Sequence, residues 1–162
     1  MTAYITEIPS GVPGDITRSR HALVEPGVLN SASTPDSYGK AVKIVNGKFE
    51  KIASGDAASV VYGLLARSVP NISNTLNQSF GSSVPNADII QSVLVQGYMI
   101  VECKVGTPVR GGSVYVRITE SGTKKVGDFE TAADSGACVA LPNVIWAVTG
   151  KDSNNCTEIR VK

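Results

Sequence analysis

The sequence contains a single histidine, His21, and this residue limits the catalytic chemistry that the chain can perform. A Ser-His-Asp arrangement would have to use it as the general base. No Gly-x-Ser-x-Gly nucleophile motif accompanies it, and the neighbouring Arg18 and Arg20 disfavour its protonated form. Asp128 and Glu130 alternate onto one face of an expected strand, which a solvated strand edge explains as well as an acid–base pair does. The residues therefore indicate a protein that is not an enzyme.

Metal and cofactor sites also lack the residue patterns that they need. The sequence has three cysteines: Cys103, Cys138 and Cys156. They are odd in number and have no Cys-x-x-Cys spacing, so we expect small buried hydrophobes rather than disulfides or a zinc site. The segment 152–155 resembles the start of a calcium loop but lacks the later glycine and glutamate, so we expect a turn. The glycines of 106–112 do not lead from a strand into a helix, and no phosphate site or cofactor is expected.

Length and charge favour one neutral domain. The chain has 162 residues, with 15 Lys and Arg against 14 Asp and Glu, which gives a net charge of +1. This balance disfavours a nucleic-acid or anionic-lipid partner. Charged residues make up 18% of the chain, below the roughly 25% that is usual. The low value is consistent either with a plain neutral surface or with a surface covered by protein partners.

Membrane and export signals are not evident. No apolar run reaches the roughly 18 residues needed to cross a bilayer, so no membrane association is expected. The segment Met1–Pro9 has neither a basic nor an apolar region of the kind found in signal peptides. We therefore expect a protein that is made in a cytoplasm.

The segment from Val93 to Arg117 predicts the central element, a β-hairpin. Val93–Val105 is rich in β-branched residues, and Ser113–Thr119 alternates, with Val114, Val116 and Ile118 on one face. The connection 106–112 supplies one proline and three glycines, which favour a chain reversal. Asn46-Gly47, between two further strand-like runs, predicts a type I′ hairpin turn.

The remaining short segments complete an all-β pattern. Interpretation of the whole chain gives roughly eight to ten strands and no convincing helix, which is typical of a sandwich, a barrel or a jelly roll. Pro26-Gly27 is expected to break one strand, 58–67 is expected to form another, and 138–142 and 144–149 are expected to be separate. Trp146 is expected in the core, with an interface anchor as the alternative.

Two segments stand apart from this pattern. Residues 1–20 contain Pro9, Gly11, Pro13 and Gly14 and predict an extended N-terminal arm, which precedes a β domain at 21–162. The arm's isolated apolar side chains are expected to dock on the domain's own sheet, a sister subunit or another protein. Residues 68–88 are polar and nearly uncharged, and predict a long surface-contact loop.

Several segments together resemble the structural cement proteins, or capsid decoration proteins, of tailed bacteriophages. The likeness runs in order along nearly the whole chain. The segments that carry it are Gly11–Arg18, Tyr38–Lys43, Gly55–Ala58, Tyr62–Arg67, Val93–Met99, Gly106–Arg117, Gly127–Glu130 and Ala140–Asn143. The loop 68–88 and the turn 152–155 depart from the family pattern.

The resemblance implies a virion structural protein with a jelly-roll-like sandwich fold and no enzymatic activity. Such a protein binds the outer capsid surface and cements neighbouring major capsid protein subunits against internal pressure, as a homodimer or a homotrimer. The candidate capsid contacts are Tyr4, Ile8, Asp15, Arg18 and Arg110. They lie in the arm and in the 106–117 segment.

The alternative function is a carbohydrate-binding β-sandwich displayed on a virion. A row of exposed aromatic residues would favour it. Aromatic residues, however, make up only 6% of the chain, and most lie in strand patterns that we expect to be buried. The capsid role is therefore the preferred hypothesis.

Overall fold

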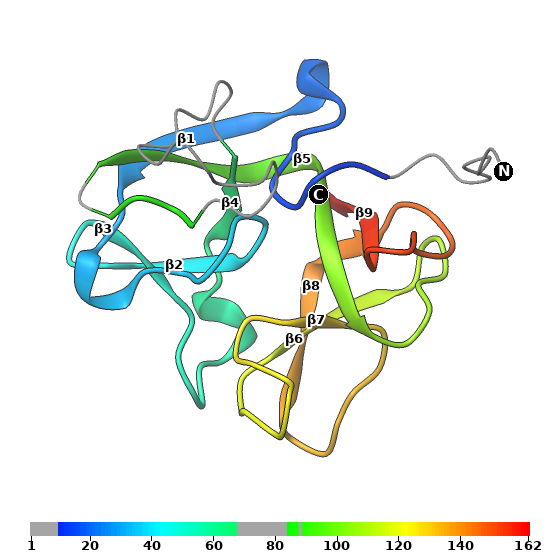
Figure 1. Ribbon diagram of the computed structural model, residues 1–162. Coiled ribbons are helices and arrows are strands. Elements are labelled where there is room, and N and C mark those ends of the chain that lie inside the picture. Colours follow the sequence, from blue (N-terminus) through cyan, green and yellow to red (C-terminus); the bar gives the residue numbers. More distant parts are fainter. Residues whose placement is uncertain (1–9, 68–83, 88) are drawn as a thin grey trace, which may run out of the picture.

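The longest element is β5, a strand of 16 residues from Ile90 to Val105 that runs through the molecule (Figure 1). The computed structural model describes residues 10–67, 84–87 and 89–162, and within them it contains nine strands and three single-turn 3₁₀ helices. The other strands are β1 (Leu23–Val28), β2 (Ala41–Val45), β3 (Lys48–Lys51), β4 (Gly63–Ala66), β6 (Ser113–Arg117), β7 (Phe129–Glu130), β8 (Cys138–Trp146) and β9 (Cys156–Val161). The helices are η1 (Ser19–His21), η2 (Ser31–Ser33) and η3 (Ala58–Val60). The all-β prediction is confirmed.

The first half of β5 belongs to one ring of strands. It pairs with β4 on one side and with β1 on the other, and the strand order is β3-β2-β4-β5-β1. A parallel bridge between Leu29, just after β1, and Phe49 of β3 joins the two ends. The β2–β3 turn has positive φ at Asn46 (50°) and Gly47 (76°), so the predicted hairpin is confirmed.

The second half of β5 belongs to another ring. Here the order is β5-β7-β6-β8-β9, and β9 pairs back with β5 from Gly97↔Val161 to Glu102↔Cys156. The pairing of these five strands thus closes on itself, and β5 is common to both rings. This pairing does not establish the jelly-roll-like arrangement, which stays a prediction.

The predicted hairpin between β5 and β6 is wrong. β7 lies between them, parallel to β5 and antiparallel to β6. The glycine-rich connection therefore carries the chain across an intervening strand rather than reversing it beside β5. Phe129 of β7 is 1% exposed and belongs to the larger cluster of buried side chains. A two-residue strand that enters from later in the sequence leaves no signal in the 93–117 segment itself.

Three further boundaries differ from the sequence predictions. β1 continues through Pro26, which pairs with Ser92 in the ladder that joins β1 to β5. Proline is tolerated because an outer strand does not need every N–H group. Residues 138–146 form one strand instead of two, and residues 58–60 form a helical turn before β4.

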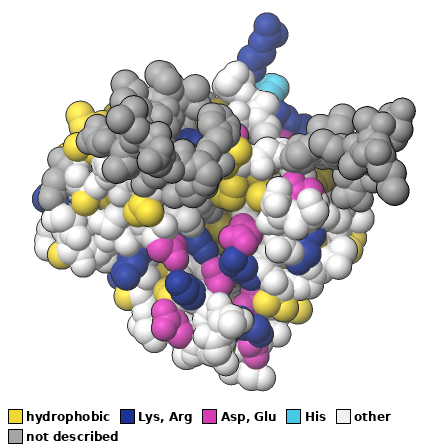
Figure 2. Space-filling view, in the orientation of Figure 1, with side chains coloured by type: hydrophobic (Ala, Val, Ile, Leu, Met, Phe, Trp, Pro, Cys, Tyr) yellow, Lys and Arg dark blue, Asp and Glu magenta, His cyan; other side chains and the backbone are white. Residues whose placement is uncertain are grey.

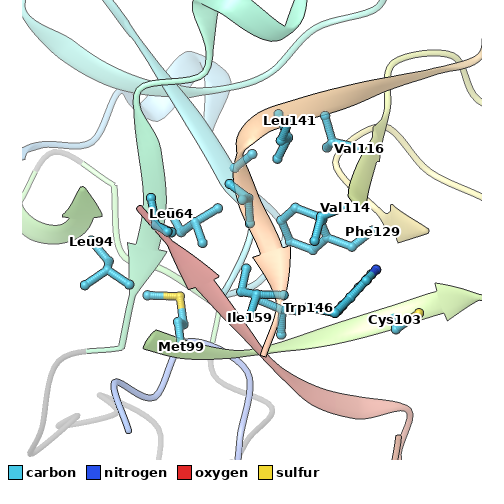
Figure 3. Close-up of a cluster of buried hydrophobic side chains, with 14 of the residues drawn as sticks. Leu64, Leu94, Met99, Cys103, Val114, Val116, Phe129, Leu141, Trp146 and Ile159 are labelled. Carbon is cyan, nitrogen blue, oxygen red and sulfur yellow. The ribbon is translucent and has the colours of Figure 1, made fainter. Parts of the chain in front are cut away.

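Two clusters of buried side chains fill the rings. The larger cluster includes Met99, Phe129, Trp146 and Ile159 and lies mainly within the second ring (Figure 3). The smaller cluster lies within the first ring and contains Leu29, Tyr38, Val42, Phe49, Leu65 and Val93. Trp146 is 1% exposed and the three cysteines are buried, so both predictions of core positions are confirmed. The alternating residues Val114, Val116 and Ile118 are all buried.

The passage of β5 from one ring to the other occurs at Gly97. Gln96 pairs with Leu23 of β1, whereas Gly97 pairs with Val161 of β9. Gly97 has a φ of 131°, and a Cβ atom there would lie 2.9 Å from the carbonyl oxygen of His21. Only glycine fits both this backbone conformation and this close approach.

Asp128, just before β7, and Glu130, within it, are both buried, so the solvated-edge interpretation of these residues is wrong. Arg117 of β6, with a fully buried side chain, donates from Nε to Oε1 of Glu130 at 2.5 Å and from Nη2 to Asp134 at 2.6 Å. Lys40 reaches Oδ1 of Asp128 at 2.5 Å. Removing one partner of such a buried pair typically costs about 3–5 kcal/mol, because the remaining charge is left without compensation.

Replacing Gly97 with alanine is expected to destabilise the protein more than replacing Gly111. Both residues have positive φ, 131° and 82°, so alanine is strained at either position. Only at Gly97 does the new Cβ atom meet backbone, since nothing lies within 4 Å at Gly111. Urea unfolding should show a loss of about 1 kcal/mol for Gly111→Ala and of at least about 3 kcal/mol for Gly97→Ala. Equal losses would contradict the proposed steric role.

Acid is expected to weaken the Arg117 network through Asp134. Hydrogen bonds from Arg117 and then from Lys124 lower the pKa of the Asp134 carboxyl below its usual range. The stabilisation is therefore complete above the unfolded-state pKa, about 3.9, and is lost as the pH falls through the lower folded-state pKa. Thermal unfolding of Asp134→Asn should show a lower midpoint than wild type at pH 7 and a shrinking difference below about pH 4. Glu120→Gln, at an exposed residue without an ion pair in the described ranges, is the control; a difference that persists at pH 2 would argue against this linkage.

Candidate interaction surface

The segment from Ser10 to Arg18 lies along β5, on the edge opposite β9. Gly14 N donates to Ile100 O at 2.8 Å, and Ile100 N donates to Asp15 O at 2.9 Å. Thr17 N donates to Tyr98 O at 3.3 Å, and the bridge between Ile16 and Met99 lies between these contacts. Within the described ranges, this part of the predicted arm therefore docks on the chain's own strand.

Arg18 ends this segment and contacts two side chains of the second ring. Its guanidinium carbon lies 4.0 Å from the centre of the Tyr98 ring, a cation–π distance. Its Nη2 donates to Glu158 Oε2 at 2.8 Å, and Thr17 Oγ1 donates to the other carboxylate oxygen. The Glu158 side chain is only 10% exposed, so the segment supplies the partners that a buried carboxylate needs.

A second arginine contacts the same tyrosine, and a third lines a hollow beside it. Arg160 lies directly opposite Tyr98 in the β5–β9 ladder, and its guanidinium carbon is 5.6 Å from the ring centre. Arg110 lines a small depression of about 120 Å³ together with Arg18, Tyr98 and Arg160. We call these four residues the arginine–tyrosine surface. No carboxylate within the described ranges pairs with Arg110 or Arg160.

A larger pocket of about 540 Å³ adjoins this surface. It is lined by Arg18, His21, Ala22, Leu23, Gln96, Gly97, Tyr98, Arg160 and Val161. The lining contains two arginines and a histidine but no carboxylate, while the carboxylate of Glu158 binds Arg18 from outside the lining. Figure 2 shows Lys and Arg side chains at the top of the molecule, near η1, whereas acidic and basic side chains are mixed lower down.

The sequence-predicted contact residues are only partly brought together. Arg18 and Arg110 meet at the arginine–tyrosine surface. Asp15 lies elsewhere, with Oδ1 3.9 Å from Nε of Arg67. Tyr4 and Ile8 lie outside the described residues, as does most of the predicted loop 68–88. Their roles as contacts stay predictions.

Sequence reasoning missed Tyr98 and Arg160 as members of this surface, and Glu158 as the partner of Arg18. All three alternate with the core residues Met99 and Ile159 on their strands. That alternation is a usable signal for side chains that leave the core, although Glu158 is itself covered, with the whole residue only 8% exposed. The missing information was the register between β5 and β9, which joins residues about 60 positions apart.

Other chemistry is not supported by the described residues. The turn at Asp152 is confirmed: its carboxylate accepts backbone N–H groups of Ser10, Asn154 and Cys156. Burial alone would raise the pKa of Asp152, but these hydrogen bonds outweigh burial and lower the pKa. Within the described ranges no group of three or more His, Cys, Asp or Glu residues is placed to hold a metal ion. No helix there is long and apolar enough to cross a membrane.

Comparison with known proteins identifies a family and a solved capsid structure with a similar fold. Residues 1–161 match the family model of the XM1 gp53 minor capsid protein. A chain from the structure described as the capsid of Myoviridae Phage XM1 superimposes with a TM-score of 0.70 at 16% sequence identity, covering 98% of this chain and 94% of that chain. At this identity the likeness shows the fold. No curated protein matches the chain.

The family match spans almost the complete chain, and it agrees with the cement-protein resemblance found in the sequence. The chain belongs to the XM1 gp53 minor capsid protein family of tailed phages, and its role is that of a structural protein of the virion.

Proposed function

We propose that this protein binds the outer surface of the phage head and cements neighbouring major capsid protein subunits against the pressure of packaged DNA. The observation that carries the proposal is the match of residues 1–161 to a minor capsid protein family. In this proposal the protein is not an enzyme, is made in the host cytoplasm and acts on the capsid as a homodimer or homotrimer. The proposal thus adds to the virion role a location, the outer surface of the head, and a task, the cementing of neighbouring subunits.

A cement needs two footholds on adjacent subunits. An interface of standard size buries about 800 Å² on each partner. Two such footholds would cover roughly a sixth of the 9178 Å² surface of one protein copy, which leaves room for contacts between copies. The low net charge is compatible with burial of this kind, because few charged groups would lose their hydration.

The N-terminal arm is proposed as one foothold, with residues 21–162 as the β domain. Tyr4 and Ile8 precede the segment that is fixed on β5, and Asp15, Arg18 and Arg110 are the further proposed contacts. The backbone bonds of Gly14 and Asp15 to Ile100 would hold the arm's base at a defined place on the domain. Such a fixed base reduces the ordering cost of binding by the residues before it.

The protein is expected to bind expanded heads more tightly than compact precursor heads. A clamp across two subunits requires the final distance between its footholds, and the compact shell does not provide this distance. Co-sedimentation of purified protein with heads of each form, both lacking this protein, measures the difference. We expect saturation on expanded heads and at least about tenfold weaker binding to precursors. Equal binding to both forms would contradict the clamp, and binding to neither would contradict capsid attachment.

Removing residues 2–9 is expected to weaken attachment without unfolding the domain. The deletion leaves the contacts of Gly14, Asp15 and Thr17 with β5 intact, so the thermal midpoint should stay within a few degrees of wild type. Co-sedimentation with expanded heads should show at least about tenfold weaker binding. A double substitution, Tyr4→Ser with Ile8→Ser, tests the same idea at full length. Saturation of heads at the wild-type concentration by both variants would remove the arm from the attachment mechanism.

A further inference from the structure

The pocket beside β5 and β9 has a charge character that differs from the rest of the chain. Two arginines, Arg18 and Arg160, and His21 line its volume of about 540 Å³, and no Asp or Glu does. We propose that this pocket binds the carboxylate side chains of an acidic segment in a partner protein. The inference rests on the proposed capsid function for the identity of the partner, but the chemistry of the pocket stands on its own.

The guanidinium groups are held in place before any ligand arrives. Arg18 and Arg160 both lie against the ring of Tyr98, at 4.0 and 5.6 Å from its centre. Arg18 commits Nη2 to Glu158, which fixes the side chain and leaves its other N–H groups free of ion pairs in the described ranges. Its side chain is 48% exposed, so these groups are accessible. A planar guanidinium that is already ordered loses little entropy when it binds a carboxylate through two hydrogen bonds.

The adjoining depression extends the cationic surface. It shares Arg18, Tyr98 and Arg160 with the larger pocket and adds Arg110, so three residues border both hollows. The backbone N of Arg110 donates to Oγ1 of Thr149 at 3.1 Å, which positions the loop that carries this side chain. An extended segment with two acidic side chains could place one in each hollow.

A protein carboxylate fits this surface better than a nucleic acid does. Duplex-binding proteins typically neutralise about 6–10 phosphates along an extended track. Here the cations are confined to two small hollows on a chain of net charge +1. Because the cations are confined to two small hollows, the surface suits one or two separate anionic groups better than a long row of phosphates.

Titration of the full-length protein with two capped peptides tests the proposal. One peptide is hexaglutamate and the other is hexaglutamine, and amide chemical shifts are followed by NMR at about 50 mM salt. We expect saturable shifts for the glutamate peptide that centre on Gly97, Tyr98, Arg160 and Val161, with none for the glutamine peptide. Arg160→Gln should weaken binding by about tenfold, because it removes a charge-assisted contact. Lys51→Gln, at an exposed lysine of the first ring, is the matched control and should bind as wild type does.

Three results would overturn the proposal. The first is equal binding of both peptides, and the second is equal weakening by Arg160→Gln and Lys51→Gln. The third is Arg160-dependent binding of a 12-base-pair DNA duplex that is as tight as binding of the glutamate peptide. Thermal unfolding of each variant establishes that it is folded. The peptide titration needs no phage heads, so loss of peptide binding with normal head attachment would refute only this inference, whereas peptide binding without head attachment would refute only the capsid function.

Discussion

The structure depends on one strand that serves two closed rings. β5 provides edges to β1 and β4 in its first half and to β7 and β9 in its second half. A single strand can do this only if it turns from one ring into the other without breaking its ladder of hydrogen bonds. Gly97 provides that turn, because its positive φ and missing Cβ allow the backbone of His21 and Ala22 to approach. β5 contributes side chains to both hydrophobic clusters, so one continuous strand connects them.

The same strand organises the candidate surface. Met99 and Val101 point into the core, so Tyr98 must point outward, where Arg160 faces it across the ladder. The segment 10–18 then pairs with the other edge of β5 and delivers Arg18 to the same ring. The arginine–tyrosine surface is therefore built on regular strands rather than on a loop. This explains how three like charges can share one place: Glu158 offsets one of them, and the tyrosine ring contacts two.

Features that depend on a few consecutive residues could be predicted from the sequence. The Asn46-Gly47 turn could be predicted because its two positive φ values are a property of four consecutive residues. The alternation of Val114 and Val116 on one face could be predicted in the same way. The strand β7 could not be predicted as the neighbour of β5, because its two residues, Phe129 and Glu130, follow far along the chain. The burial of Arg117, on the face opposite Val114 and Val116, could not be predicted either, because its partners Glu130 and Asp134 are 13 and 17 positions away.

The candidate contacts show the same division between local and non-local information. Arg18 and Arg110 were proposed from separate segments, and their convergence on Tyr98 required the register of β5 with β9 and with residues 15–17. This convergence also bears on how a foothold would transmit force. The segment 10–18 is bonded through Ser10 to the turn at Asp152, through Gly14 and Asp15 to Ile100, and through Arg18 to Glu158. These bonds link the segment to β5, to β9 and to the turn that precedes β9. Arg18 belongs both to the arm and to the arginine–tyrosine surface, so the same strands hold both, and in the proposed capsid role a load on the arm would pass to these strands.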